Sequence, residues 1–521
     1  MQFQIFLMFA LLRSNEAPLE SELSDIKTSS SDMDSRLAFL DDEIARLRAR
    51  VEQLEEERIV IRTRREHNRA ILSPLRRMPP EVLAEVFLWS LPPRYVDYKR
   101  GGYDVKESPW VLTHVCSRWR AVALSTSSLW SCIVITYFPE NVSFSAYPLP
   151  LVKAHIQRSG SQQLVVSFEG CETSDWEPQV EVFRCLAQHC GRWVELDMRL
   201  TSPLLPLLIS LRDQVPCLRK IWLEWYNLEI QAGVQTINCF ETARALVDVG
   251  ISTLPPYIPI PLPVHQLTRY SMNAPWHVHQ SILKLAPNLV EARICVATDE
   301  RWSESQPSPI TLPFLRRLYA SDTEILDYTT VPTLEEIAFC VDGDDLDLQR
   351  RLASLLDRSS CPLRRLCLAG RPTASGTLSI LKTLSCIVEL VILNTDKESD
   401  NDDETSDDED ETLDDVNTLM LMLTVSGVAG CATVAPQLRC MFFGYDGKPS
   451  LSCAFYLEMI RSRWRAAHCR IESAALVVPE APPPKALDAL FALRRDGLDL
   501  FVVWGDDPAA GDVVDRWLYN T

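Results

Sequence analysis

The sequence predicts a multi-domain chain with an N-terminal α-helical coiled coil, a small three-helix module and then an irregular α/β solenoid. Three observations predict this organisation. A heptad pattern of apolar residues begins at residue 37, a proline-punctuated apolar segment occupies residues 73–135, and a short apolar unit recurs within residues 150–521. With 521 residues and 46% hydrophobic composition, the chain is long enough for several domains with large cores.

Residues 1–36 are predicted to be a disordered N-terminal tail with an apolar start. The first twelve residues, MQFQIFLMFALL, are similar to the apolar core of a signal peptide, but no basic segment precedes them and no small-residue cleavage site follows. A disordered apolar tail or a misassigned start are the alternatives. The run is too short to cross a bilayer, so no membrane partner is expected. Residues 13–36 are rich in Ser, Asp and Glu, which is typical of disorder.

Residues 37–72 are predicted to form a coiled-coil-like helix. Apolar side chains alternate at spacings of three and four residues, at Leu37, Leu40, Ile44, Leu47, Val51 and Leu54. Opposite charges occupy the g and following e positions, at Glu43 with Arg48, Arg50 with Glu55, and Glu57 with Arg62. This charge pattern favours a parallel dimer, so we expect a parallel homodimer through residues 37–61. The alternative is a long solvated helix that packs its apolar stripe on its own chain.

Residues 150–521 contain an irregular repeat in which an apolar residue is followed by others three and five positions later. Nine units fit this pattern, and they begin at Trp193, Leu218, Leu267, Leu289, Leu315, Leu334, Leu363, Ile387 and Leu438. Six of the eight gaps are 19–29 residues long, and the gap of 49 is close to two units. These lengths are typical of leucine-rich repeats, which stack one strand per unit over a continuous core. We predict a degenerate leucine-rich-repeat-like solenoid, with an ordinary α/β or α+β domain as the alternative.

Residues 396–415 form an acidic insertion within one repeat. They hold thirteen acidic side chains and one lysine, and so supply −12 of the net charge of −19. Like charges at this density repel one another, which predicts a solvated disordered loop. Because neither this insertion nor the remaining chain is basic overall, no nucleic-acid partner is expected.

The sixteen cysteines are scattered through the chain, and several lie within apolar runs. A free thiol behaves as a small apolar side chain in such a setting. The dispersion predicts reduced thiols rather than a disulfide framework. We therefore expect the protein in the cytoplasm, the nucleus or both.

Residues 73–135 carry more apolar surface than three small helices can bury among themselves. Pro79 and Pro80 suit a helix start, and Glu81 is favoured in the first turn by the helix dipole. The first helix is apolar on several sides, at Val82, Leu83, Val86 and Phe87. A polar spacer at about 94–108 leads to a second predicted helix with apolar positions Leu112, Val115, Cys116 and Trp119. Either the repeat region or a partner must cover the apolar surface that these helices cannot bury themselves.

The sequence of this module resembles an F-box. The pattern is Met-Pro-Pro-Glu-Val-Leu-x-x-Val-Phe at 78–87, then Leu-x-x-Val-Cys-x-x-Trp-Arg-x-x-Ala at 112–123 and Leu-Trp at 129–130. It is most similar to the large fungal type, which implies a non-catalytic receptor that docks to the Skp-type adaptor of a cullin–RING ubiquitin ligase. The repeats would bind a client protein. Met78 stands where the family usually has leucine, and the spacer is longer than in compact F-boxes.

Carried over by position, the resemblance implies an adaptor-binding set. Its members are Pro79, Glu81, Val82, Leu83, Val86, Phe87, Leu112, Val115, Cys116 and Trp119. A non-degradative coiled-coil scaffold is the alternative function. An enzyme is disfavoured because the sequence has no Walker-type loop, H-E-x-x-H or G-x-S-x-G motif. No catalytic residue, cofactor or metal site is predicted.

Overall fold

The structure is a computed structural model, and it describes most of the chain. The described residues are 12–13, 17–91, 108–135, 149–171, 176–225, 236–253, 257–296, 309–343, 346–394, 408–425, 434–445, 452–466 and 468–505. The signal-like residues 1–11, the predicted spacer up to residue 107 and the acidic residues 396–407 lie outside them. The chain divides into two compact units, Met1–Val86 and Phe87–Thr521.

The first unit consists mainly of one long helix, α2 (Glu20–Ile71), followed by the 3-10 helix η1 (Pro74–Arg76). At 1.5 Å per residue, the 52 residues of α2 extend about 78 Å. The expected helix at 37–72 is therefore present, but α2 starts earlier, and the prediction of disorder fails for residues 20–36. Glu20 and Glu22 favour this start because acidic side chains stabilise the first turn. The Glu22 carboxylate also accepts a hydrogen bond of 3.0 Å from the Leu19 backbone N–H.

A group of short helices follows. It comprises α3 (Pro80–Trp89), α4 (Leu112–Val115), α5 (Ser117–Ser125) and the 3-10 helix η2 (Ser127–Trp130). The unit boundary falls within α3. The sequence predicted one continuous helix from Leu112 onward, and this is wrong because Cys116 is extended, with φ −162° and ψ 170°. The break turns Cys116 into the N-cap of α5, where its Sγ accepts a hydrogen bond of 3.5 Å from the Trp119 N–H.

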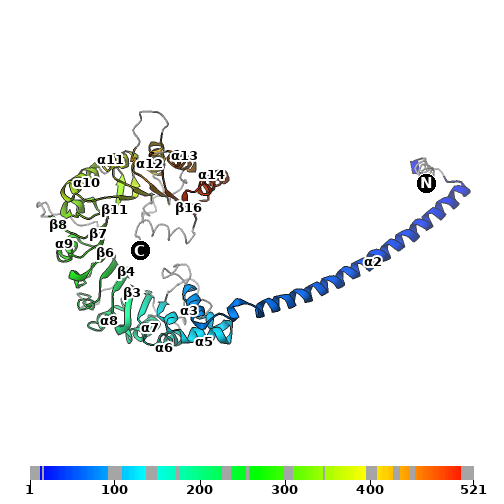
Figure 1. Cartoon of the computed structure of the whole chain (residues 1–521), viewed down its shortest axis with the longest axis horizontal. Helices are drawn as coiled ribbons and strands as arrows, with labels where there is room; N and C mark the ends of the chain where they lie inside the picture. The colour runs from blue at the N-terminus through cyan, green and yellow to red at the C-terminus, as the bar shows by residue number, and fades with distance from the viewer. Residues whose placement is uncertain are drawn as a thin grey trace. The chain divides into compact units, whose positions relative to one another are not determined.

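The rest of the second unit is built on a parallel sheet in which each strand pairs with the next one along the chain. Figure 1 shows its strands side by side along an arc, with α7, α9 and α10 on the outer side. The strands are β1 (Cys132–Ile135), β2 (Leu164–Glu169), β3 (Trp193–Arg199), β4 (Lys220–Trp225), β5 (Asp248–Thr253), β6 (Arg269–Ala274), β7 (Glu291–Val296), β9 (Arg317–Ala320), β11 (Glu336–Gly343), β12 (Arg365–Pro372), β13 (Glu389–Asn394), β14 (Cys440–Tyr445), β15 (Ser473–Val478) and β16 (Asp499–Trp504). A separate two-stranded sheet joins β8 (Ile310–Thr311) to β10 (Thr329–Thr330).

Helices or 3-10 turns connect most neighbouring strands. They are α6 (Leu149–Arg158), α7 (Glu177–Ala187), η3 (Cys190–Arg192), α8 (Leu205–Ile209), η4 (Val264–Gln266), α9 (Trp276–Leu285), η5 (Thr323–Tyr328), α10 (Leu346–Ser359), α11 (Ala374–Thr383), α12 (Asp408–Leu423), α13 (Cys453–Arg465) and α14 (Pro484–Arg495). The chain therefore has a long N-terminal helix followed by an open, mostly parallel α/β region.

Each of the nine predicted apolar units coincides with a strand of the large sheet, from β3 to β14. The 49-residue gap contains one further strand, β5, which agrees with its length of two units. The sheet also extends beyond the predicted units, through β1 and β2 at one end and β15 and β16 at the other. It starts at Cys132, so the expected module at 73–135 and the strand region overlap at β1.

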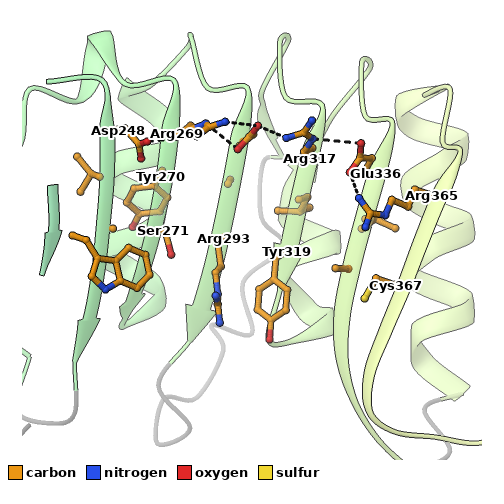
Figure 2. A pocket seen from close by; sticks show the side chains of 18 of the residues that line it. Asp248, Arg269, Tyr270, Ser271, Arg293, Arg317, Tyr319, Glu336, Arg365 and Cys367 are labelled. Carbon is orange, nitrogen blue, oxygen red and sulfur yellow. Dashed lines mark hydrogen bonds and ion pairs between the residues drawn. The ribbon is translucent and has the colours of Figure 1, made fainter. Parts of the chain in front are cut away.

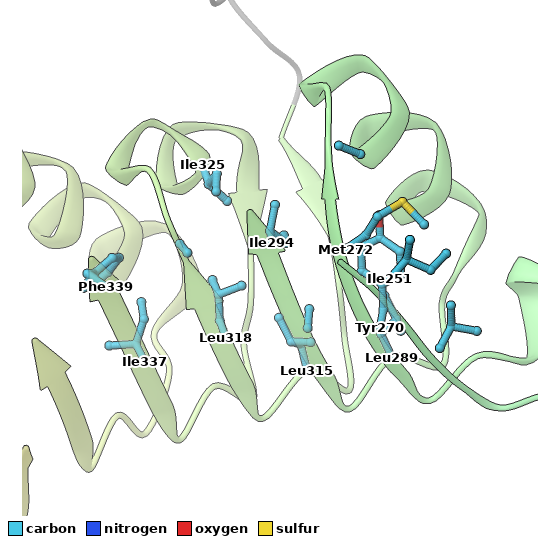
Figure 3. Packing of buried hydrophobic residues seen from close by; sticks show 14 of the residues in the cluster. Ile251, Tyr270, Met272, Leu289, Ile294, Leu315, Leu318, Ile325, Ile337 and Phe339 are labelled. Atoms are coloured by element: carbon cyan, nitrogen blue, oxygen red, sulfur yellow. The ribbon is translucent and has the colours of Figure 1, made fainter. Parts of the chain in front are cut away.

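The main core lies between the sheet and the helices on its outer side. Side chains alternate between the two faces of a strand, and those on the helix side are apolar. Tyr270, Met272, Leu318, Ile337 and Phe339 are each at most 2% exposed in this core (Figure 3). The opposite, inner face of the sheet is free of helices between β4 and β12 within the residues described, and it carries polar side chains instead.

The predicted disorder of the acidic insertion is wrong for its last residues, because α12 begins at Asp408. The structure gives one reason for order there. The Asp415 carboxylate accepts a hydrogen bond of 3.0 Å from the Ala374 backbone N–H, which starts α11. Such an acceptor satisfies a backbone donor that the helix itself leaves unpaired.

Candidate docking site

Helix α3 has one buried and one exposed apolar stripe. Leu83 and Phe87, four residues apart, are 0% and 1% exposed. Val82, Val86 and Trp89 follow the i, i+4, i+7 spacing of another face and are 47%, 42% and 87% exposed. A helix with two apolar stripes has more apolar surface than one contact can cover.

Phe87 is the first residue of the second unit, and it makes an aromatic contact within that unit. The rings of Phe87 and Trp119 have centroids 4.8 Å apart and planes at 57°. Trp119 belongs to α5, and its backbone N–H donates to the Cys116 cap at the start of that helix. The Arg120 Nε also donates a hydrogen bond of 2.7 Å to the Thr113 carbonyl of α4. These contacts fix α4 and α5 relative to each other and leave Val115 55% exposed.

A cluster of aromatic and basic side chains joins α4, α5 and η2 to the strand region. The Arg158 guanidinium lies 4.4 Å from the Trp110 ring centroid and 4.5 Å from that of Trp130. His155, from the same helix α6, packs edge-on against Trp130 at 5.1 Å. The Trp130 Nε1 donates a hydrogen bond of 2.8 Å to the Ala123 carbonyl. Helices α5 and η2 are therefore packed against the end of the α/β region.

The predicted adaptor-binding residues separate into buried, half-buried and exposed members. Leu83, Phe87 and Leu112 are buried within this chain, so they support the helices and present no surface to a partner. Trp119 is half-buried. The remaining members are exposed, and these are Pro79, Glu81, Val82, Val86, Val115 and Cys116.

The adaptor-binding set that the resemblance implies leaves out Trp89, which is the most exposed large apolar side chain of α3. The signal was available, because Trp89 lies seven residues after Val82 and three after Val86. Those spacings place the three side chains on one helical face. The helical period identifies the exposed face of α3 better than the match to the F-box motif does.

The inner face of the sheet carries a row of charged side chains, which we call the charge ladder. Neighbouring strands contribute residues of alternating charge that the strand register places opposite one another. From β3 to β13 these are Glu195, Lys220, Asp248, Arg269, Glu291, Arg317, Glu336, Arg365 and Glu389. Ion pairs link successive members from Asp248 to Glu389, and Figure 2 shows those between Asp248 and Arg365. Cross-strand pairs of opposite charge stabilise a sheet, whereas like charges would repel.

The ladder is most removed from water near β12. Arg365 has a side chain only 6% exposed and lies 3.0 Å from the Glu336 carboxylate and 3.2 Å from that of Glu389. Burial raises the pKa of Asp248, and the neighbouring Lys220 and Arg269 oppose that shift. The ladder therefore adds cross-strand attraction between neighbouring strands along the inner face.

Within the described part of the chain, no cluster of three or more His, Cys, Asp or Glu side chains has the arrangement of a metal site. The cysteines described there are free thiols. None of the described helices is both long and apolar enough to span a membrane. The chain matches no protein-family model and no curated protein sequence.

Proposed function

We propose that the chain is an F-box-type substrate receptor that docks to the Skp-type adaptor of a cullin–RING ubiquitin ligase. The sequence pattern at 78–130 and the apolar surface of α3 and α4 support this proposal. The chain would contribute binding alone, since catalysis would reside in other subunits. Its α/β region would act as a degenerate leucine-rich-repeat-like receptor for a client protein, in the cytoplasm or nucleus.

The exposed stripe of α3 carries the proposal. Val82, Val86 and Trp89 are each more than 40% exposed on one short helix. Large apolar patches on a protein surface mark interaction sites, whereas single exposed apolar residues do not. Covering three such side chains at about 1.5–3 kcal/mol each would yield roughly 5–9 kcal/mol before the cost of association. Val115 of α4 adds further apolar surface.

Burial changes the role that the family resemblance implies for part of the motif. Leu83, Phe87 and Leu112 would form the foundation of the docking surface, because they are enclosed by this chain. Direct contact with the adaptor would come from Val82, Val86 and Val115, with Trp89 added to the set.

The test is adaptor binding by a surface variant that keeps the core intact. We expect the double variant Val82→Asp, Val86→Asp to lose at least about 100-fold in affinity for a purified Skp-type adaptor, measured by isothermal titration calorimetry. Both side chains are exposed, so the variant should keep the thermal midpoint of the parent.

A matched control is Leu285→Asp, which places the same charge on an exposed helical leucine, 62% accessible, at the end of α9. It should bind the adaptor as the parent does. If the parent chain does not bind the adaptor, or if the double variant binds it equally well, the docking assignment is wrong.

A second function is favoured by a separate observation. Every apolar residue of the α2 heptad pattern from Leu37 to Leu54 is at least 40% exposed. A coiled-coil scaffold that assembles without the ligase would use this stripe and leave the α3 stripe unused. The two functions are separated by measuring adaptor affinity in a variant whose α2 stripe is disrupted. If that variant binds the adaptor as the parent does, docking depends on the α3 stripe and not on the α2 stripe.

A further inference from the structure

A groove on the inner face of the sheet lies beside the charge ladder. Its volume is about 310 Å³, and it extends from β4 to β12. Its floor is formed by residues two positions after the ladder residues on each strand, which we call the inner row. From β4 to β12 the inner row is Trp222, Gly250, Ser271, Arg293, Tyr319, Ala338 and Cys367.

One end of the inner row is a flat apolar platform. A Cβ atom at Gly250 would lie 2.0 Å from Cε3 of the Trp222 indole, so the ring lies directly against the Gly250 backbone. Only glycine at residue 250 leaves room for the Trp222 ring to lie there. The indole is partly accessible to solvent and is available to a large apolar side chain from outside.

The centre of the inner row is basic. The Arg293 guanidinium lies over the Tyr319 ring, 4.8 Å from its centroid (Figure 2). The inner row has no carboxylate between β4 and β12. With the ladder included, five basic and three acidic side chains line the groove, a net charge of +2 in a chain of −19. A basic groove in an acidic protein is complementary to an anionic partner.

We propose that this groove binds an extended acidic segment of a client protein, with a carboxylate on Arg293 and a large apolar side chain on Trp222. The guanidinium offers a planar pair of donors that matches a carboxylate. The proposal rests on the proposed function only in naming the segment as part of a client.

The sheet sets the spacing between the two contacts. Trp222 is on β4 and Arg293 on β7, three strands away in the order β4-β5-β6-β7. At about 4.8 Å per strand, the two positions are roughly 14 Å apart. An extended segment that crosses the strands rises about 3.4 Å per residue, so about four residues separate its apolar and acidic side chains. Residues four apart in an extended chain also point to the same side.

The experiment uses the full chain and fluorescein-labelled twelve-residue peptides of Ser and Gln. Each peptide contains one Leu-Leu pair and one Glu-Glu pair, and the pairs are two, four or six residues apart. Fluorescence anisotropy should give the highest affinity at a spacing of four. Arg293→Glu should weaken that peptide about tenfold and should favour the matching Lys-Lys peptide.

Arg184→Glu is the matched control, because Arg184 is an exposed arginine on α7. It should leave both affinities unchanged. Arg293→Gln tests the same contact without adding a negative charge, and it should weaken the Glu-Glu peptide without favouring the Lys-Lys peptide. Circular dichroism should show that all variants are folded.

The proposal is overturned if the three spacings bind equally, if Arg293→Glu binds as the parent does, or if only a phosphoserine version of the peptide binds. Its failure is distinguishable from failure of the adaptor proposal. The Val82→Asp, Val86→Asp variant should keep its peptide affinity while losing the adaptor, since neither residue lines the groove.

Discussion

The Phe87 and Trp119 rings pack against each other with centroids 4.8 Å apart, whereas Val86, one residue earlier, has 42% of its surface exposed. Phe87→Ala should therefore lower the free energy of unfolding by about 3–5 kcal/mol, the usual cost of removing a buried aromatic ring. Val86→Ala should change it by less than about 0.5 kcal/mol. Equilibrium urea unfolding monitored by tryptophan fluorescence measures both. Equal effects would contradict the assignment of separate buried and exposed stripes on α3.

The apolar period predicted the strands because burial on the helix side of the sheet imposes it. Leu218, Ile221 and Leu223 are each 0% exposed, and the same positions recur in the other units. The unit that contains β5 has the same spacing at Leu246, Val249 and Ile251. It fits the pattern and was overlooked, although Gly250, at the variable position between its last two apolar residues, is of a type disfavoured within strands.

Other features depend on contacts that no local pattern contains. At the ends of the sheet, Gln163 and Gly497 replace the first apolar residue of the units of β2 and β16, so these two units do not fit the pattern. The units of β1 and β15, which begin at Trp130 and Ile471, do fit it and were overlooked. The charge ladder was hidden because the repeat length varies, so the members pair only once the strand register is known. Leu83 and Val82 are both apolar residues of one motif, and only the fold distinguishes the buried one from the exposed one.

Arg365 should be the most sensitive member of the charge ladder. Arg365→Ala would leave Glu336 and Glu389 without the guanidinium that lies between them, in a region that is largely shielded from water. Removing one partner of a buried ion pair costs about 3–5 kcal/mol. Urea unfolding at neutral pH should show a loss of that size.

Arg439→Ala is the comparison for this prediction. Arg439 pairs with Glu472, and both side chains are more than half exposed. Exposed pairs contribute about 0–1 kcal/mol, so this variant should be nearly neutral. Similar losses in the two variants would mean that the ladder does not stabilise the sheet through its most buried ion pairs.

His155 should make the second unit sensitive to acid. Burial, together with the nearby Arg158, lowers its pKa from 6.5 to about 3. Between pH 6.5 and pH 3 the unfolded chain therefore binds a proton at this residue and the folded chain does not. The free energy of unfolding should fall as the pH drops below 6.5, by about 1.4 kcal/mol per unit.

The measurement is urea unfolding at pH 7 and pH 5 for the parent and for His155→Gln. The parent should lose about 2 kcal/mol more than the variant over this interval, because glutamine cannot take up the proton. Taking the difference removes the contribution of other titrating groups. An identical pH dependence in both proteins would show that His155 does not titrate differently on unfolding.

Helix α2 should pair with a second copy of itself. Ile44 and Val51 occupy seam positions and are 44% and 55% exposed. A long helix that leaves its apolar stripe in water lacks the packing from which most helices gain stability. Sedimentation equilibrium should give about twice the chain mass of 59.1 kDa, and Ile44→Asp with Val51→Asp should restore the monomer mass.

Ala45→Asp is the control, since residue 45 follows the seam position Ile44 and is also exposed. It should leave the dimer intact. The opposite charges at Glu43 and Arg48 favour the parallel orientation, although the structure pairs Glu43 with Arg46 of the same helix at 2.7 Å. Segment 30–75 contains no cysteine, so Leu40→Cys in that segment should oxidise to a disulfide-linked dimer only if the two copies run parallel and in register. A parent chain that sediments at 59.1 kDa would leave α2 as a solvated single helix.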